Sequence, residues 1–190
     1  MSLATNREPI ILIGPLKGGK TTVGKLLAER LQWPFVSLDR LERHYAQQIG
    51  FDPEMASAIQ ASQGDLAWYS YRRRFFGEVV LRFLAEHREG VLELGGGHPI
   101  LPEATEQRKL NDVLAGYRNV VLLMPSANIQ ESLAFLKSRQ KPEHLNPDLN
   151  DLLLDDRRFF DLARFVIYTQ GKLPPETCDE IISLLDLAHT

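Results

Sequence analysis

The segment IILIGPLKGGKT, residues 10–21, joins a short apolar run to a glycine-rich turn that ends in a lysine and a hydroxyl residue. Its first four residues are continuously apolar, which is typical of a strand buried on both faces. The residues that follow place Val23, Leu26, Leu27 and Leu31 at helical spacing. The segment matches G-x-x-x-x-G-K-[ST] between a predicted strand and a predicted helix, which is the context in which this pattern is informative.

The composition of this turn suits the binding of phosphate groups. Glycines permit a tight curl in which backbone N–H groups point inward at an anion. The N-terminus of the following helix contributes partial positive charge, Lys20 a full charge, and the Thr21 hydroxyl a ligand for Mg²⁺. We therefore expect ATP and Mg²⁺ as cofactors, held by Gly14, Pro15, Leu16, Lys17, Gly18, Gly19, Lys20, Thr21 and Thr22.

Apolar runs alternate with helical patterns along the rest of the chain. Further strands are predicted at 34–39, 90–97, 119–125 and 164–169, and helices at 21–31, 41–86, 126–140, 151–162 and 176–187. The long helical stretch has breaks near Gly50–Pro53 and Gly64. This alternation predicts one α/β domain, residues 1–190, with a parallel sheet covered by helices on both faces. Ligands of such sheets bind beyond the carboxyl ends of the strands.

Composition narrows the class of protein further. The chain has 190 residues, a net charge of −3 and one cysteine, Cys178. The charge argues against nucleic acid as a partner, because nucleic-acid binders usually carry a basic surface. One cysteine excludes an internal disulfide, and no apolar run is long enough to span a membrane. We expect a soluble cytoplasmic protein, a monomer or weak dimer, with no membrane partner.

Two carboxylates occupy positions where catalysis or metal binding is expected. Asp39 ends the second predicted strand and is the candidate for orienting an attacking hydroxyl; the alternative is a helix N-cap. Glu93 lies in an otherwise apolar strand, where an unpaired carboxylate is costly, so it needs a cation or a donor. We predict that Glu93 acts with Thr21 at Mg²⁺, and an ion pair with Lys or Arg is the alternative.

With the phosphate loop, Asp39 and the turn LGGG at residues 94–97, the sequence resembles the shikimate kinases. The likeness is strong to about Gly97 and weaker after it. It implies a P-loop three-layer fold with five parallel strands in the order 2-3-1-4-5, a helical substrate-binding region at about 40–88 and a lid at about 139–152. It also implies substrate contacts from Asp39 and from Gly95, Gly96 and Gly97.

The sequence departs from the family at several positions. The family pattern D-x-D reads Ser37-Leu-Asp39 here, so the first, magnesium-associated aspartate is missing. Spacing to the glycine turn points to Arg73 or Arg74 as the substrate-binding arginine of the helical region. The family's lid arginine precedes a proline, where this chain has Lys141 and, nearby, Arg139. The late arginine that grips the substrate carboxylate has its counterpart in Arg157-Arg158, and we take Arg158.

These observations predict an ATP-dependent kinase that phosphorylates a hydroxyl of a small, anionic, hydroxylated metabolite. Lys20, Asp39 and Arg139 are the predicted catalytic residues, and Asp39, Arg73 and Arg158 with the glycine turn the predicted substrate contacts. Shikimate is the leading acceptor. A sugar acid or a nucleoside as acceptor, a non-catalytic nucleotide-binding module and a nucleic-acid kinase remain as alternatives.

Overall fold

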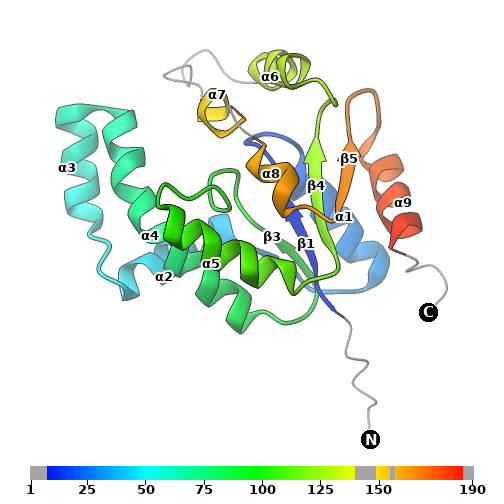
Figure 1. Ribbon diagram of the computed structural model, residues 1–190, viewed down its shortest axis with the longest axis horizontal. Coiled ribbons are helices and arrows are strands. Elements are labelled where there is room, and N and C mark those ends of the chain that lie inside the picture. The colour runs from blue at the N-terminus through cyan, green and yellow to red at the C-terminus, as the bar shows by residue number, and fades with distance from the viewer. Residues whose placement is uncertain (1–7, 140–148, 155–156, 186–190) are drawn as a thin grey trace, which may run out of the picture.

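A computed structural model describes residues 8–139, 149–154 and 157–185 (Figure 1). Five parallel strands form one sheet with the order β2-β3-β1-β4-β5. The strands are β1 (Ile10–Ile13), β2 (Phe35–Ser37), β3 (Val91–Glu93), β4 (Val120–Met124) and β5 (Phe165–Tyr168). The predicted fold class and strand order are confirmed.

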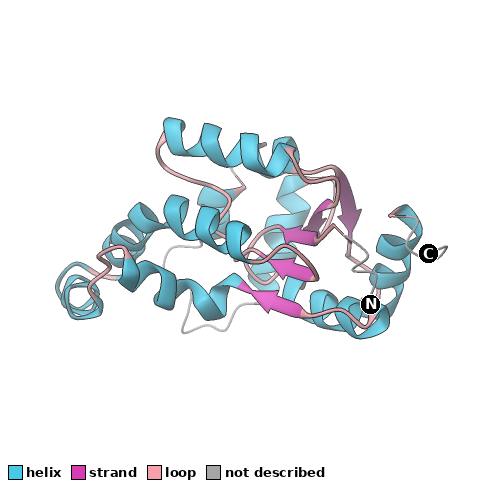
Figure 2. Ribbon diagram, turned by 90° about the horizontal axis from the view of Figure 1, so that it is seen from below, coloured by secondary structure: helices cyan, strands magenta, loops and turns pink. Residues whose placement is uncertain are grey.

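Helices cover both faces of the sheet (Figure 2). The side chains of β1 alternate between the two sides. Ile10 and Leu12 pack with α1 (Lys20–Leu31) and α9 (Pro174–Leu184). Ile11 and Ile13 face the larger cluster, which is built by α4 (Asp65–Glu86), α5 (Ala104–Ala115) and α8 (Arg158–Leu162). Burial on both faces explains why the strands are apolar without a break.

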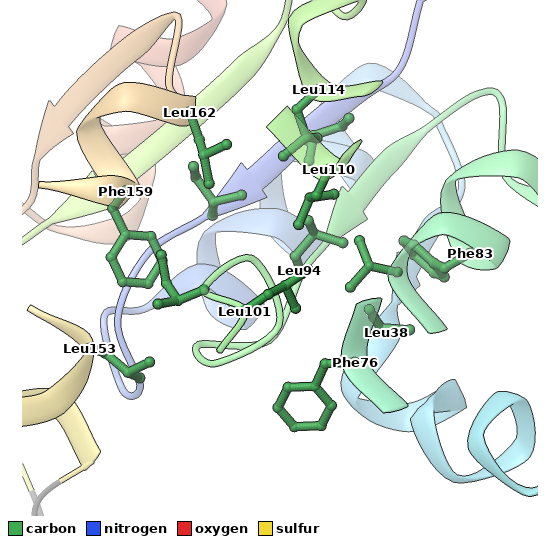
Figure 3. Close-up of a cluster of buried hydrophobic side chains, with 14 of the residues drawn as sticks. Leu38, Phe76, Phe83, Leu94, Leu101, Leu110, Leu114, Leu153, Phe159 and Leu162 are labelled. Atoms are coloured by element: carbon green, nitrogen blue, oxygen red, sulfur yellow. The ribbon is translucent and has the colours of Figure 1, made fainter. Parts of the chain in front are cut away.

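The larger cluster also supports the carboxyl ends of the strands. Figure 3 shows Leu38, Phe76, Leu94, Leu101 and Phe159 among its side chains. Leu94 and Leu101 bracket the glycine turn, and both are almost completely buried. Packing on both sides therefore fixes where this turn begins and ends.

Three helices form the region between β2 and β3: α2 (Leu38–Gln48), α3 (Pro53–Gln63) and α4. The break before α3 has a local cause, because the Asp52 side chain accepts hydrogen bonds from the Glu54 and Met55 N–H groups. Gly64, with φ +86°, separates α3 from α4. Both breaks expected in the helical stretch are confirmed.

Other boundaries differ from those predicted. The second strand ends at Ser37, so Asp39 lies in the first turn of α2. Helix α6 (Ile129–Ser138) begins later than the predicted 126, because the Asn128 side chain accepts from two N–H groups and caps the helix there. Two short helices, α7 (Leu149–Leu153) and α8, replace the one expected at 151–162. Helix α5 was not predicted as an element.

Within the residues that the structure describes, no helix combines the length and apolar character needed to cross a bilayer.

Candidate active site

The phosphate loop connects β1 to α1 at the carboxyl edge of the sheet. Gly14 and Gly19 have φ of +142° and +91°, and Gly19 is the residue from which α1 begins. Glycine suits both positions, because side chains rarely tolerate such φ values. The predicted loop therefore has the backbone that its composition indicated, with the open N-terminus of α1 at its end.

Lys20 is the first residue of α1, and its side chain turns back over the loop. Nζ donates to the carbonyls of Gly14, at 3.0 Å, and Pro15, at 2.8 Å. Burial lowers the pKa of this ammonium, while the negative charges of Asp39 and Glu93 act in the opposite direction. A buried cation held against its own loop is positioned for an anionic ligand.

A cavity of about 270 Å³ opens over this loop. Three residues from other elements also line it: Asp39 of α2, Glu93 of β3 and Arg139 at the end of α6. Arg139 Nη1 donates to the Lys17 carbonyl at 3.4 Å, and its guanidinium packs on Phe135. The structure therefore gathers the three predicted catalytic residues, Lys20, Asp39 and Arg139, around one cavity.

Glu93 and Thr21 meet in this cavity. The Thr21 hydroxyl donates to Glu93 Oε1 at 2.5 Å, whereas the buried Oε2 has no hydrogen-bond partner among the described residues. Glu93 is opposite Ser37 in the register of β2 and β3. The alternative of an ion pair finds no support, because no Lys or Arg within the described part of the chain forms a salt bridge with Glu93.

A second cavity, of about 280 Å³, lies between α2, α3 and α4. Its lining combines carboxylates, arginines and rings: Asp39, Glu42, Arg43, Phe51, Pro53, Ala56, Ser57, Trp68 and Arg72. Among the residues that the structure describes, Asp39 alone lines both this cavity and the phosphate cavity. Its carboxylate therefore marks the boundary across which a group held at the loop meets a molecule held in the helical region.

The glycine turn is required by close approaches of three other parts of the chain. A Cβ on Gly95 would overlap the Asp39 carboxylate, and one on Gly97 would overlap the Tyr69 hydroxyl. A Cβ on Gly96 would lie 2.7 Å from the Leu16 backbone nitrogen. The turn thus brings the phosphate loop, α2 and α4 together.

The arginines are distributed differently from the prediction. Arg73 donates to the Ile100 carbonyl at 3.1 Å and Arg158 to the Leu101 carbonyl at 2.9 Å, and neither lines the cavity beside Asp39. Arg72 lines it instead, with a two-pronged ion pair to Glu42 and its guanidinium 4.3 Å from the Trp68 ring. The sequence pointed to Arg73 or Arg74 instead, and Glu42, the partner that holds Arg72, lies 30 positions away.

Arg43 is a second cavity residue that sequence reasoning missed. It is exposed and forms no ion pair or hydrogen bond with any residue that the structure describes. Asp39 and Arg43 are four residues apart on α2, so they lie on the same face of the helix. The helix was predicted to begin at Leu41, which concealed this spacing.

Asn150 is also new, and it connects the lid region to the phosphate loop. Its side-chain oxygen accepts from the Leu16 N–H at 2.9 Å, and its amide donates to the Leu16 carbonyl at 3.2 Å. Most of the predicted lid, residues 140–148 including Lys141, lies outside the described residues. The described end of the lid is thus fixed directly to the loop.

A third, smaller cavity of about 110 Å³ continues from the loop toward the end of β5. It shares Gly18, Gly19, Thr22 and Arg139 with the phosphate cavity and reaches Thr169 and Pro174. This cavity therefore extends the phosphate site toward the turn that follows β5.

A loop of this kind after the first strand of a 2-3-1-4-5 sheet, with a second cavity beside it, defines a P-loop phosphotransferase. The sequence profile described as shikimate kinase matches residues 18–186. The shikimate kinase of Streptomyces coelicolor is 31% identical over 183 residues, which cover 94% of this chain and 95% of that protein. That of Thermodesulfovibrio yellowstonii is 28% identical over 176 residues, with 91% and 92% covered.

A solved structure gives the same architecture. The shikimate kinase from Acinetobacter baumannii in complex with shikimate has a TM-score of 0.60 at 23% identity, covering 96% of this chain and 94% of its own. At that identity the likeness shows the fold alone. The profile and the relatives together show that the chain belongs to the shikimate kinase family and is an ATP-dependent kinase of a small molecule.

Proposed function

We propose that this protein transfers the γ-phosphoryl group of ATP to a hydroxyl of shikimate. The observation that carries the proposal is the position of Asp39, which lines the phosphate cavity and the second cavity at once. Phosphoryl transfer depends mainly on positioning and on charge stabilisation, so a carboxylate between donor and acceptor suits the reaction. Relatives named shikimate kinase support shikimate as the acceptor.

At the donor end, the loop amides and Lys20 hold the phosphates. Lys20 exchanges the Gly14 and Pro15 carbonyls for phosphate oxygens, to which a buried ammonium binds more strongly than in water. Arg139 approaches the same cavity from the end of α6 and adds charge as the phosphoryl group moves. The third cavity, between Arg139 and Pro174, receives the nucleoside.

Thr21 and Glu93 are the residues that would hold Mg²⁺. The fit rests on the Thr21 hydroxyl contact with Glu93 and on the unpartnered buried oxygen of that carboxylate. Hydroxyl and carboxylate oxygens are the ligands that Mg²⁺ prefers. When bound, the ion neutralises part of the charge on the phosphate oxygens.

At the acceptor end, Asp39 accepts a hydrogen bond from the hydroxyl that attacks. Arg43 and Arg72 supply positive charge for the carboxylate of shikimate, and Trp68 and Phe51 form an apolar wall for its ring. Gly95, Gly96 and Gly97 keep the backbone close to Asp39. Arg73 and Arg158 hold the carbonyls just beyond this turn, so we assign them a supporting role in the substrate site.

A coupled assay of ADP release tests the proposal. Shikimate, gluconate, a nucleoside or a DNA oligonucleotide is added in separate assays to wild-type protein with ATP and Mg²⁺. We expect release with shikimate, and a loss of about 100-fold or more in kcat for Asp39→Asn, because proton transfer contributes roughly 10²–10⁴ in rate. Asp112→Asn, an exposed change on α5, is the matched control.

The other outcomes reassign the protein. Release with gluconate or the nucleoside alone would place it on a different acceptor, and release with the oligonucleotide alone would make it a nucleic-acid kinase. Tight ATP binding with no release for any acceptor would make it a nucleotide-binding module.

A further inference from the structure

His98 follows the glycine turn and is almost completely buried, with 2% of its surface exposed. Each of its ring nitrogens faces a carboxylate of α2. Nε2 lies 3.1 Å from Glu42 Oε2, and Nδ1 lies 3.5 Å from Asp39 Oδ1. The ring is thus a buried histidine between two carboxylates, one of which lies at the boundary of the two cavities.

The Glu42 contact fixes which ring nitrogen carries the proton. Although burial alone would raise the pKa of Glu42, its hydrogen bonds to His98 and Arg72 lower it. An ionised carboxylate only accepts hydrogen bonds, so Nε2 carries the hydrogen and donates it. In a neutral ring the lone pair is then on Nδ1, which has no hydrogen-bond partner within the described residues.

The ring is held rigidly in this orientation. Phe76 packs on it with a centroid distance of 4.6 Å, and Arg72 anchors Glu42 through both carboxylate oxygens. A Cβ on Gly95 would overlap both the Asp39 carboxylate and His98 Nδ1. The absence of a side chain at Gly95 therefore allows these two groups to approach each other. The ring faces Asp39 and Glu42 from α2, and the charges next to Glu42 are Arg72 and, beyond it around Tyr69, Arg73 from α4.

We propose that His98 is a positioning residue that acts through Asp39 and receives the proton of the acceptor hydroxyl from it. The acceptor oxygen forms a bond to the γ-phosphorus while the bond to the β–γ bridging oxygen breaks, and that electron pair leaves with ADP. The hydroxyl proton moves to Asp39 and then to Nδ1. The resulting imidazolium lies between the Asp39 and Glu42 carboxylates, and it loses the proton to water once the product departs.

This inference rests on the proposed role of Asp39, but its main test does not need the acceptor. Imidazole nitrogen-15 spectra of the ATP-free protein at pH 7.5 report which ring nitrogen is protonated. The chain has five histidines, so the His98 signal is identified by its loss in His98→Gln. We expect a protonated Nε2 and an unprotonated Nδ1, whose signal shifts in Asp39→Asn because the new amide can donate to it. A proton on Nδ1 in the resting protein would overturn the proposal, whatever the acceptor proves to be.

Kinetics of two variants give the second test. The glutamine amide of His98→Gln can still donate to Glu42 but has no nitrogen at the position of Nδ1. His98→Asn keeps a polar group near Asp39 but loses the hydrogen bond to Glu42. We expect His98→Gln to lower kcat about tenfold or more, within the roughly 10²–10⁴ that proton transfer supplies, with acceptor KM and ADP affinity unchanged. His44→Gln, at an exposed position on α2, is the control.

If His98→Gln altered KM and lowered the melting temperature as well as lowering kcat, the residue would have a merely structural role. That result would contradict the proposal. Failure of wild-type protein to release ADP with shikimate would instead refute the proposed function, and the nitrogen-15 spectrum would still decide the inference.

Discussion

Ser37 and Glu93 are direct partners in the register of β2 and β3, and Glu93 lines the phosphate cavity. The family pattern has an aspartate at the position of Ser37 on β2. This chain lacks that aspartate, but it has the carboxylate of Glu93 at the paired position on β3. Since Glu93 Oε1 accepts from Thr21 and Oε2 is unpartnered, Glu93 can serve the cation from the neighbouring strand.

This exchange predicts a rescue experiment. Glu93→Gln should raise the Mg²⁺ concentration for half-maximal activity by about 10- to 100-fold, the usual cost of removing a group that tunes a metal site. The double change Ser37→Asp with Glu93→Gln should recover most of the loss, because it returns a carboxylate to the adjacent position. An unchanged Mg²⁺ requirement in Glu93→Gln would exclude Glu93 from the metal site.

Arg43 predicts a selective loss at the acceptor end. Arg43→Gln should raise the KM for the acceptor by about 10- to 100-fold, since a hydrogen bond to a charged group is worth about 1.5–3 kcal/mol. The KM for ATP should not change. Arg40→Gln is the matched control, because Arg40 is exposed on the same helix and does not line the cavity. Equal effects of both substitutions would mean that only net charge matters.

Asn150 predicts a coupling between the lid region and the phosphate loop. Asn150→Ala removes both hydrogen bonds to the Leu16 backbone in a fully buried position. We expect the free energy of unfolding to fall by about 1–3 kcal/mol, the cost of buried groups left unpaired, and ADP to bind more weakly in calorimetry. Asn119→Ala, whose side chain makes no hydrogen bond in the described structure, is the control. Unaltered ADP affinity with lowered stability would refute the coupling.

Glu42 predicts how stability depends on pH. Its pKa is about 2 in the folded protein against an ordinary value of 4.5, so its contribution is complete above pH 4.5 and is lost as the pH falls toward 2. A difference of this size corresponds to about 3 kcal/mol. In urea unfolding, wild type should exceed Glu42→Gln most at pH 7, and the gap should narrow below pH 4.5. Glu78→Gln, in an exposed pair with Arg82, should show a small gap throughout, and a constant gap for Glu42→Gln would contradict the account.

Much of the fold could be predicted because its signals are local. The phosphate loop, the cap at Asp52 and the break at Gly64 each depend on a few adjacent residues. The same holds for the alternation of strands and helices, although the strand order came from resemblance to a family. The start of α2 was misplaced because Ser37, its N-cap, makes no side-chain capping bond.

The parts of the site that escaped prediction depend on residues remote in sequence. Arg72 is defined by Glu42, which lies 30 positions away, and Asn150 by Leu16, which lies 134 positions away. No periodicity or motif reports such pairs. Arg43 is different, because its four-residue spacing from Asp39 is visible once α2 is known to begin at Leu38.

The most direct test of the central claim is a crystal structure of the protein with ADP and shikimate. We expect ADP phosphates on the loop beside Lys20, a shikimate hydroxyl within hydrogen-bond distance of Asp39, and the shikimate carboxylate facing Arg43 and Arg72. Shikimate bound away from Asp39, or with its carboxylate on Arg158 and no contact to the second cavity, would contradict it.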